Sequence, residues 1–246
     1  MLSKSDIKYI QSLSHKKFRD QEGVFVVEGL KMVDELLREH QQKVKSIYAL
    51  RDWYDKRNVA IPSSIQTHAV EEFELLKISS QKSPQEVLAL VEISTNHIKT
   101  YNPKGVTVVL DRIQDPGNLG TIIRACDWFG VRDIVCSHDT VDVFNPKVVQ
   151  SAMGSMMRVN VYYTELLAFI HANSNIPVFA AVLGGTSIHE IEFNHPCMLI
   201  IGNESTGVSS EILKFNPRQI SIPKIGNAES LNAAVATSII LSACNK

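Results

Sequence analysis

The stretch Ser221-Ile-Pro-Lys-Ile-Gly-Asn-Ala-Glu-Ser-Leu-Asn-Ala-Ala-Val-Ala-Thr-Ser-Ile-Ile-Leu-Ser-Ala243 decides how this chain is interpreted. It predicts a strand end, a polar loop that carries Gly226, and a helix with one apolar face. Small residues are unusually frequent in that helix, so another backbone can approach it closely. Asn227, Ser230 and Asn232 stand at or near the helix start, where free N–H groups favour a polar or anionic ligand group. Ordinary N-capping by Asn227 or Ser230 is the alternative, and this stretch alone favours it.

Upstream of this stretch, apolar runs alternate with helical patterns. Nearly continuous apolar runs predict strands that are covered on both faces, as in a parallel sheet: Val106 to Leu110, Asp133 to Cys136, Pro177 to Leu183 and Cys197 to Ile201. Helical patterns stand between or after them: Leu119 to Phe129, Pro146 to Ala152, Thr164 to Ala172 and Ser209 to Phe215. We therefore predict a doubly wound α/β domain over residues 105–246. In such a domain, ligands bind beyond the carboxyl ends of the strands.

In the first part of the chain, the sequence patterns of strands and helices are shorter. Residues 1–93 predict a small α/β or α+β domain, and the polar residues 94–104 predict a linker. Residues 1–20 carry five Lys or Arg and two Asp, a local charge of +3. Such a basic arm could follow RNA phosphates, and an ordinary solvated surface is an equally good interpretation.

Composition favours a globular protein in the cytoplasm, with no membrane or metal role. Hydrophobic residues make up 44% of the 246 residues and charged residues 21%, and the net charge is −1. No apolar run reaches the length of about eighteen residues that spans a membrane, and the first residues do not resemble a signal peptide. The four cysteines are scattered without a C-x-x-C pair, so we expect reduced core thiols: Cys126, Cys136, Cys197 and Cys244.

A polar loop follows the first strand of the predicted sheet. Within it, Asp115-Pro-Gly117 predicts a turn and Asn118 predicts the N-cap of the next helix. Arg124 lies off the apolar stripe of that helix. It could pair with Asp127 one turn later, or it could face a site or a partner subunit.

A second polar loop follows the run that ends at Ile201. Gly202 and Gly207 bracket a turn before a helix, which permits close approach of a ligand to the backbone, and Glu204 supplies a carboxylate. The chain contains neither the Gly-Lys-Ser/Thr of a phosphate-binding loop nor a G-x-G-x-x-G pattern. A dinucleotide-binding enzyme is therefore disfavoured.

Three motifs, in order, resemble those of the SpoU (TrmH-like) family of RNA ribose methyltransferases in the SPOUT superfamily. They stand here as Asn118 through Val131, Ile201 through Ser209, and Ile222 through Ala236. The resemblance covers about residues 105–246, and residues 1–93 are similar, more weakly, to a ribosomal-protein-like substrate-binding domain. Ser205 stands where many members have Gly, and Ala233 where Val is frequent.

The resemblance implies transfer of a methyl group from S-adenosylmethionine to a ribose 2′-hydroxyl of rRNA or tRNA. It also implies a deep C-terminal trefoil knot that forms the cofactor pocket, and a homodimer. The implied cofactor-binding residues are Leu183, Gly184, Gly202, Asn203, Ile222 and Leu231. The implied catalytic residues are Arg124, Asn118, Glu204, Ser230 and Asn232.

Arg124 matches the family's essential arginine. Because the pKa of an arginine lies above about 12, we favour stabilisation of the developing alkoxide and contact with a phosphate over a general-base role. The alternative function is a non-catalytic RNA-binding or ribosome-assembly factor on the same fold. The presence of Arg124, Glu204 and Asn232 together argues against it.

Overall fold

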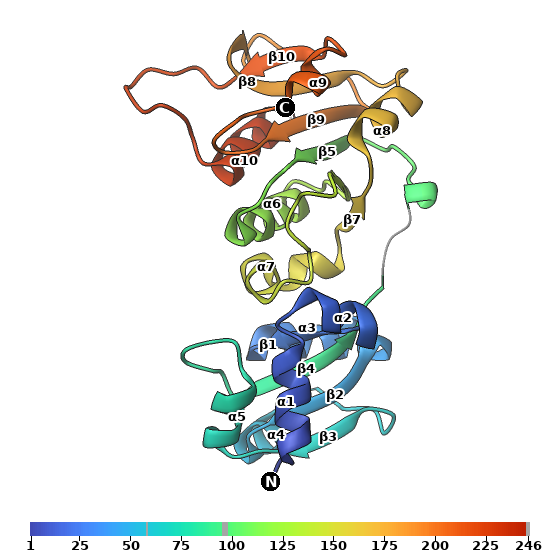
Figure 1. Ribbon diagram of the computed structural model, residues 1–246, viewed down its shortest axis with the longest axis vertical. Coiled ribbons are helices and arrows are strands. Elements are labelled where there is room, and N and C mark those ends of the chain that lie inside the picture. The colour runs from blue at the N-terminus through green and yellow to red at the C-terminus, as the bar shows by residue number, and fades with distance from the viewer. Residues whose placement is uncertain (58, 95–97, 245–246) are drawn as a thin grey trace. The chain divides into compact units, whose positions relative to one another are not determined.

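The structure is a computed structural model that describes residues 1–57, 59–94 and 98–244. The chain divides into two compact units, Met1–Ser94 with Phe144–Gly154, and Thr95–Val143 with Ser155–Lys246. Each unit contains one β-sheet (Figure 1). Part of the predicted linker, residues 95–97, lies outside the described residues. The short helix η2 (Ile98–Thr100) follows it.

The first unit is built on a mixed four-stranded sheet in the order β1-β4-β2-β3. Its strands are β1 (Val24–Glu28), β2 (Val44–Ala49), β3 (Gln66–Ala69) and β4 (Val87–Glu92). Its helices are α1 (Lys4–Ser12), α2 (Lys16–Glu22), α3 (Leu30–Glu39), η1 (Gln41–Lys43), α4 (Arg51–Lys56) and α5 (Glu72–Ile78). Apolar residues of α1 and α5, Ile10 and Leu75 among them, pack with Leu88 and Leu90 of β4 in one core cluster.

The segment Phe144–Gly154 belongs to the first unit although it lies far along the chain. Its helix α7 (Pro146–Ala152) packs against β1. The ring centroids of Phe25 and Phe144 lie 4.8 Å apart, and Gln81 Nε2 donates a hydrogen bond of 2.5 Å to Gln150 Oε1. The chain therefore crosses between the two units at three places along its length.

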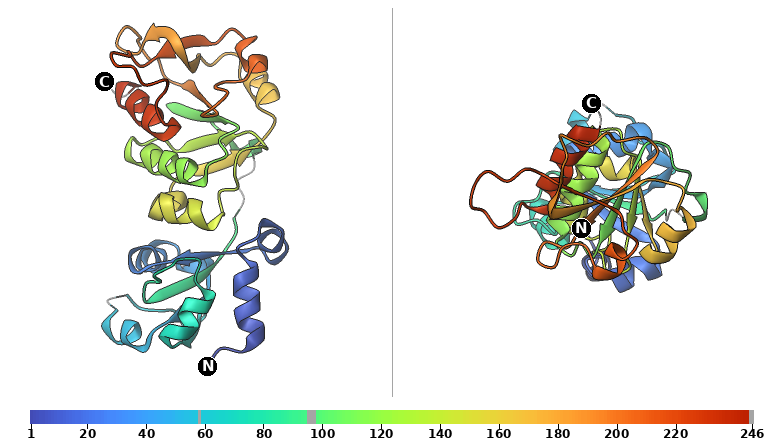
Figure 2. Two further views of the ribbon diagram at one scale, coloured as in Figure 1. Left: turned by 60° about the vertical axis from the view of Figure 1, so that its left-hand side comes forward. Right: turned by 90° about the horizontal axis from the view of Figure 1, so that it is seen from above.

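The second unit is built on a six-stranded sheet in the order β10-β8-β9-β5-β6-β7, with every pair parallel. Its strands are β5 (Val106–Asp111), β6 (Asp133–Cys136), β7 (Asn160–Tyr163), β8 (Val178–Ser187), β9 (Cys197–Gly202) and β10 (Arg218–Ser221). Its helices are α6 (Pro116–Trp128), α8 (Leu166–Ala172), α9 (Ser210–Leu213) and α10 (Ala233–Cys244), and η3 (Met153–Met157) spans a unit boundary. Helices α6 and α10 lie on one face of the sheet, and α8 and α9 lie on the other (Figures 1 and 2). The predicted doubly wound α/β sheet is confirmed.

The predicted start of helix α6 was wrong by three residues. The helix begins at Pro116, and Asp115 is its N-cap, with Asp115 Oδ1 accepting a hydrogen bond of 2.8 Å from the backbone N–H of Asn118. A proline suits the first helical position because its missing N–H has no intrahelical partner to lose. The Asn118 side chain is therefore free of capping. The predicted stop is confirmed, since Gly130 follows the C-cap with φ +72°.

The four cysteines are free and buried in the core of the second unit. Burial raises the pKa of the Cys197 thiol to about 11 and that of Cys244 to about 12, and it raises those of Cys126 and Cys136 further. Protonated thiols are poor nucleophiles at neutral pH, so these residues are packing groups. No helix of the described residues is both long enough and apolar enough to cross a membrane.

Candidate active site

Three loops of the second unit meet beyond the carboxyl ends of its strands, and each carries one of the predicted motifs. Strands β5 and β9 pair up to the partners Asp111 and Gly202, so the loops that follow them begin side by side. The third loop leaves β10, extends away from the sheet, and returns at Asn232 to begin α10 (Figure 1). Because α10 packs against α6, that return brings the third motif to the first.

A chain of side-chain hydrogen bonds joins the three loops. Asn232 Nδ2 donates to Asn118 Oδ1 over 2.7 Å, and Asn118 Nδ2 donates to the carboxylate of Glu204. These residues come from positions up to 114 residues apart in the sequence. Three of the predicted catalytic residues are therefore direct neighbours.

The cap of helix α10 fixes the direction of this chain. Asn232 Oδ1 accepts the backbone N–H groups of Ala234 at 2.9 Å and Val235 at 3.3 Å. An amide whose oxygen is used in this way presents its NH₂ group to the next partner. Asn118 must then accept with its oxygen and donate with its nitrogen, which directs an N–H of Asn118 toward the Glu204 carboxylate. The predicted caps Asn227 and Ser230 are therefore wrong, because Asn232 caps α10, and the same side chain also bonds Asn118.

Arg124 lies on the exposed face of α6, the helix that also carries Asn118. Within the described residues it has no hydrogen bond or ion pair. The pairing with Asp127 considered from the sequence is wrong, because Arg158 occupies that carboxylate, with Nη2 2.8 Å and Nε 3.0 Å from Asp127 Oδ2. Arg124 is thus available to a ligand.

Ser230 is exposed in the loop between β10 and α10, together with its neighbours. In the part of the chain that the structure describes, it makes no hydrogen bond. It stands two residues before Asn232 in the same loop, but it does not join the chain of amides.

The predicted cofactor residues Leu183 and Gly184 lie in an irregular part of β8. Strand β8 continues to Ser187, whereas the sequence predicted its end at Leu183. Residues 181–185 bulge out, because Gln219 of β10 pairs with Ala180 and the next residue, Ile220, pairs with Thr186. Beside the bulge, β8 leaves β9 after Ala180. The bulge leaves the Leu183 side chain 75% exposed.

Backbone crowding fixes the loop after β9. A Cβ atom on Gly202 would lie 2.2 Å from backbone atoms of Gly207 and Val208, so only glycine fits there. Asn203 and Gly207 exchange both backbone hydrogen bonds, and Asn203 Oδ1 accepts from the backbone N–H and hydroxyl of Ser205. Asn203 Nδ2 donates to the Arg112 carbonyl over 2.9 Å. The Asn203 side chain therefore holds the loop and is not left over for a ligand.

Two residues at the end of β5 were missed from the sequence. Asp111 is 4% exposed, and its Oδ2 accepts the backbone N–H of Ser209 over 2.7 Å. Its Oδ1 accepts from Arg112 Nε over 3.1 Å. A carboxylate directly after a buried apolar run was the available signal, since a buried charge requires partners.

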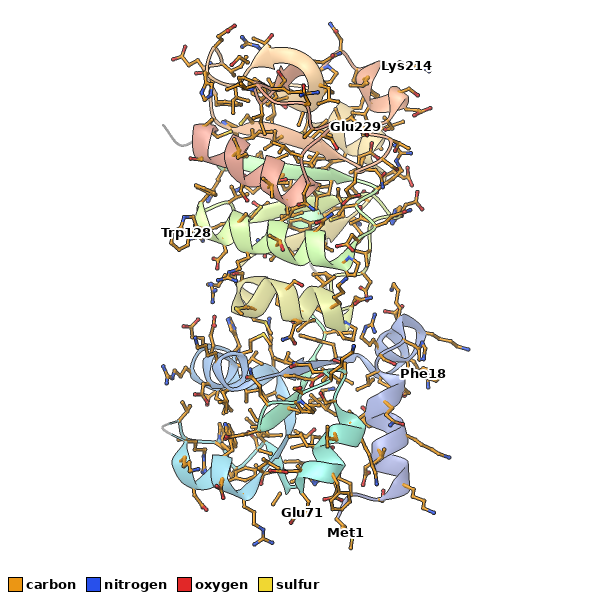
Figure 3. All side chains as sticks on the ribbon, turned by 90° about the vertical axis from the view of Figure 1, so that its left-hand side faces the viewer. Met1, Phe18, Glu71, Trp128, Lys214 and Glu229 are labelled. Atoms are coloured by element: carbon orange, nitrogen blue, oxygen red, sulfur yellow. The ribbon has the colours of Figure 1, made fainter. Side chains whose placement is uncertain are left out.

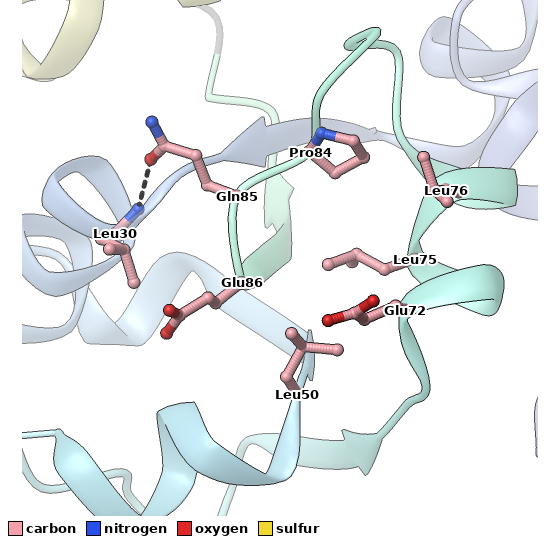
Figure 4. A pocket seen from close by; sticks show the side chains of 8 residues that line it. All are labelled: Leu30, Leu50, Glu72, Leu75, Leu76, Pro84, Gln85 and Glu86. Atoms are coloured by element: carbon pink, nitrogen blue, oxygen red, sulfur yellow. Dashed lines mark hydrogen bonds between the residues drawn. The ribbon is translucent and has the colours of Figure 1, made fainter.

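A cavity in the first unit is lined by described residues of which none belongs to the motifs. It has a volume of about 590 Å³ and lies between α5, β4 and α3. Its lining combines leucines with carboxylates: Leu30, Leu50, Leu75, Leu76, Pro84, Gln85, Glu72 and Glu86. Figure 4 shows the Glu72 and Glu86 carboxylates near the same opening as Leu50 and Leu75. Two carboxylates oppose binding of a polyanion such as RNA.

Family models match both parts of the chain. Residues 105–242 match the SpoU rRNA Methylase family, and residues 4–89 match the MRM3-like substrate binding domain. The chain is 30% identical to the 23S rRNA (guanosine(2553)-2′-O)-methyltransferase RlmP of Bacillus subtilis, a match that covers 96% of this chain and 94% of that protein.

Solved structures agree with these matches along the whole chain. One is a putative RNA methyltransferase of the TrmH family from Porphyromonas gingivalis, with 34% identity, a TM-score of 0.86 and coverage of 99% of this chain and 98% of that chain. Another is an AdoMet-bound rRNA methyltransferase from Sinorhizobium meliloti, with 29% identity, a TM-score of 0.88 and coverage of 99% and 95%.

Proposed function

The chain belongs to the SpoU rRNA Methylase family, and we propose that it transfers the methyl group of S-adenosylmethionine to a ribose 2′-hydroxyl of ribosomal RNA. The observation that supports this most strongly is the hydrogen-bonded chain from Asn232 through Asn118 to Glu204, on the helix and loops that also carry Arg124. Ribosomal RNA is favoured over tRNA because the RlmP relative, which matches over 94% of its own length, is named as a 23S rRNA enzyme.

S-adenosylmethionine supplies a methyl group that is already activated on a sulfonium. The protein must align the ribose oxygen with that methyl group and stabilise the charge that develops when the hydroxyl proton is lost. Arg124 suits the second task, because a guanidinium remains protonated and offers several donors. Asn118, held between Asn232 and Glu204, suits the first. Glu204 orients that amide, and Ser230 offers an exposed hydroxyl two residues before Asn232.

For the cofactor, residues near the divergence of β8 from β9 fit best. Leu183 and Leu231 expose apolar side chains, at 75% and 47%, that suit an adenine ring or a methionine chain. Gly184 has φ +77°, and Gly202, which has no side chain, lets the backbone of Gly207 and Val208 pack directly against it and so shapes the loop beside the cofactor. Ile222 completes the apolar lining. Asn203 contributes through the loop that it holds together.

A trefoil knot in the second unit is part of this proposal. The order β10-β8-β9-β5 supports it, because the chain must return from the outer strand β10 to α10, which packs against α6 and the inner strand β9. The buried small residues Ala233, Ala234 and Thr237 of α10 suit such a close passage.

We assign the two parts of the chain the roles predicted from the sequence. Residues 105–246 carry the transfer reaction and residues 1–93 engage RNA, as the match to a substrate-binding domain supports. Residues 1–20 offer RNA fewer positive charges than their count suggests. Arg19 is only 2% exposed and donates to the carbonyls of Leu13 and Ser14. Lys4, Lys8 and Lys17 are exposed. A cytoplasmic location stays a prediction.

A homodimer is also proposed, and exposed apolar groups on two adjacent helices support it. Trp128 at the end of α6 is 84% exposed and points outward (Figure 3). Val235 and Ile239, one turn apart on α10, are 47% and 37% exposed. Light scattering is expected to give twice the mass of one chain, and Val235→Glu with Ile239→Glu is expected to reduce it to one.

The decisive experiment for the function is methylation of ribosomal RNA from a strain that lacks this protein. Calorimetry with S-adenosylmethionine should give one site per chain, and incubation with labelled cofactor should yield a 2′-O-methylated nucleoside on digestion. Binding of the cofactor without transfer to any ribosomal RNA would contradict the proposed substrate. Absence of binding at millimolar cofactor would favour the non-catalytic RNA-binding factor.

A further inference from the structure

Arg112, the residue after strand β5, has a backbone conformation that arginine rarely adopts. Its φ is +60°, and it is one of three non-glycine residues with positive φ among the described residues. L-amino acids other than glycine pay a steric cost in this region, and such strain tends to persist where it serves a function. The position would suit glycine, so the arginine side chain itself calls for an explanation.

Hydrogen bonds hold Arg112 on both sides of its α-carbon. Its backbone N–H donates to Ser137 Oγ over 2.9 Å, and its carbonyl accepts from Asn203 Nδ2 over 2.9 Å. Both bonds are made by the backbone, so any residue that tolerates this φ could make them. Fixing the loop that carries Glu204 therefore does not require an arginine.

The guanidinium is oriented but only partly used. Nε donates to Asp111 Oδ1 over 3.1 Å, and the side chain is 35% exposed. Asp111 is 5% exposed at its side chain and also accepts the backbone N–H of Ser209. Within the described residues, Nη1 and Nη2 of Arg112 make no hydrogen bond or ion pair, and the pKa of Glu211 is lowered first by a backbone hydrogen bond and to a lesser extent by the Arg112 charge. A buried carboxylate thus holds an arginine whose outer donors remain available at the carboxyl end of the central strand, next to the Glu204 loop.

We infer that Arg112 binds a phosphate group of the RNA backbone beside the reacting ribose. Two parallel N–H groups suit a phosphate, and Asp111 reduces the entropy that an arginine loses when it is held in place. The inference rests on the proposed function for its choice of ligand. The carboxylate of S-adenosylmethionine has similar chemistry, and the experiment separates the two.

The strained backbone provides a clean test of charge against structure. Arg112→Gly retains both backbone hydrogen bonds and relieves the positive φ, but it removes the Nε partner of the buried Asp111 carboxylate, so its melting temperature is measured beside its RNA affinity to establish that it folds. Arg112→Gln removes the charge and leaves a shorter, neutral polar side chain. Arg112→Lys keeps the charge and loses the paired donors. Arg132→Gln is the matched control. Arg132 is an exposed arginine that precedes the amino end of β6, whereas Arg112 follows the carboxyl end of β5.

The measurement is RNA affinity against salt concentration, with ribosomal RNA from a strain that lacks this protein, so that it does not depend on turnover. Arg112→Gln and Arg112→Gly are expected to weaken binding about tenfold and to reduce the log–log salt slope by about 0.7, the loss of one phosphate contact. Arg112→Lys should retain the slope. Arg132→Gln and the affinity of every variant for S-adenosylmethionine should be unchanged.

Wild-type RNA affinity and salt slope in Arg112→Gln would overturn the inference. So would a tenfold loss of cofactor affinity with unchanged RNA binding, which would assign Arg112 to the cofactor carboxylate. Failure of the proposed function is distinct, because the wild type itself would then bind RNA without methylating it.

Discussion

The motif loops of the second unit and the cavity of the first unit differ in what they offer a ligand. The cavity is large, with about 590 Å³, but its lining is leucine and carboxylate. The loops offer an open surface in which Asn232, Asn118 and Glu204 are hydrogen-bonded in a fixed direction. Catalysis depends on polar groups that are held in a fixed arrangement, so the volume of a cavity alone does not identify an active site.

The largest effect is expected when Arg124, which lies on helix α6, is removed. Arg124→Ala is expected to lower the rate constant of methyl transfer by about a hundredfold to a thousandfold, because it removes the charge that stabilises the developing alkoxide. Single-turnover kinetics with labelled cofactor measures this. Calorimetry should find unchanged affinity for S-adenosylmethionine, and equal rates in the variant and the wild type would refute the role.

The second test concerns the backbone beneath the loop. In Gly202→Ala the new methyl group would overlap the backbone of Gly207, so we expect a loss of about 1–3 kcal/mol in the free energy of unfolding and at least about tenfold weaker cofactor binding. Gly226→Ala is the matched control, since nothing lies within 4 Å of its added Cβ. Equal stability and equal cofactor affinity of the two variants would mean that the close packing of Gly202 on the Gly207 backbone is not needed for function.

A third substitution separates the cap from the amide chain. Asn232→Asp keeps the oxygen that caps α10 and removes the N–H donor to Asn118, so the free energy of unfolding should change by less than about 0.5 kcal/mol. The rate of transfer should fall about threefold to tenfold, the weight of one hydrogen bond. Asn232→Ala should add the loss of the cap, about 1 kcal/mol in thermal or urea unfolding. A full rate in Asn232→Asp would show that the link to Asn118 is dispensable.

The smallest effect is expected in the cavity. Glu72→Gln together with Glu86→Gln should change RNA affinity and methyl transfer by less than about twofold if RNA does not enter the cavity, because salt screens charges that lie farther than about 10 Å from a polyanion. Filter binding and the transfer assay test this. A tenfold change in either quantity would mean that the cavity takes part in substrate binding.

The sequence predicted the parts of this fold that depend on local pattern. Continuous apolar runs identified β5, β6 and β9, since a strand buried on both faces leaves few polar positions. The bulge at residues 181–185 could not be predicted, because register depends on which strand lies alongside. Arg19 shows the same limit, since a count of charges does not reveal that its guanidinium is buried against two carbonyls.

The candidate site was predicted as a set of residues, and the structure supplies the connections between them. The order of the motifs does not predict the hydrogen bond between Asn232 and Asn118, because this bond forms only when α10 lies beside α6. The wrong N-cap at Asn118 has a local cause, since both Asp115 and Asn118 are good capping residues and the proline decides between them. The role of Arg112 could not be predicted from the sequence, because the residue type arginine does not indicate a positive φ.

The grouping of Phe144–Gly154 with the first unit has a consequence for how the protein can be dissected. A protease that cuts within residues 94–104 breaks only one of three covalent crossings. The amino-terminal fragment then still holds α7 through packing on β1 and through the rings of Phe25 and Phe144. The two fragments of such a nicked protein should co-elute, and a recombinant fragment of residues 105–246 would present α7 without the surface it covers. Swapping the first unit between relatives therefore requires α7 to be exchanged with it.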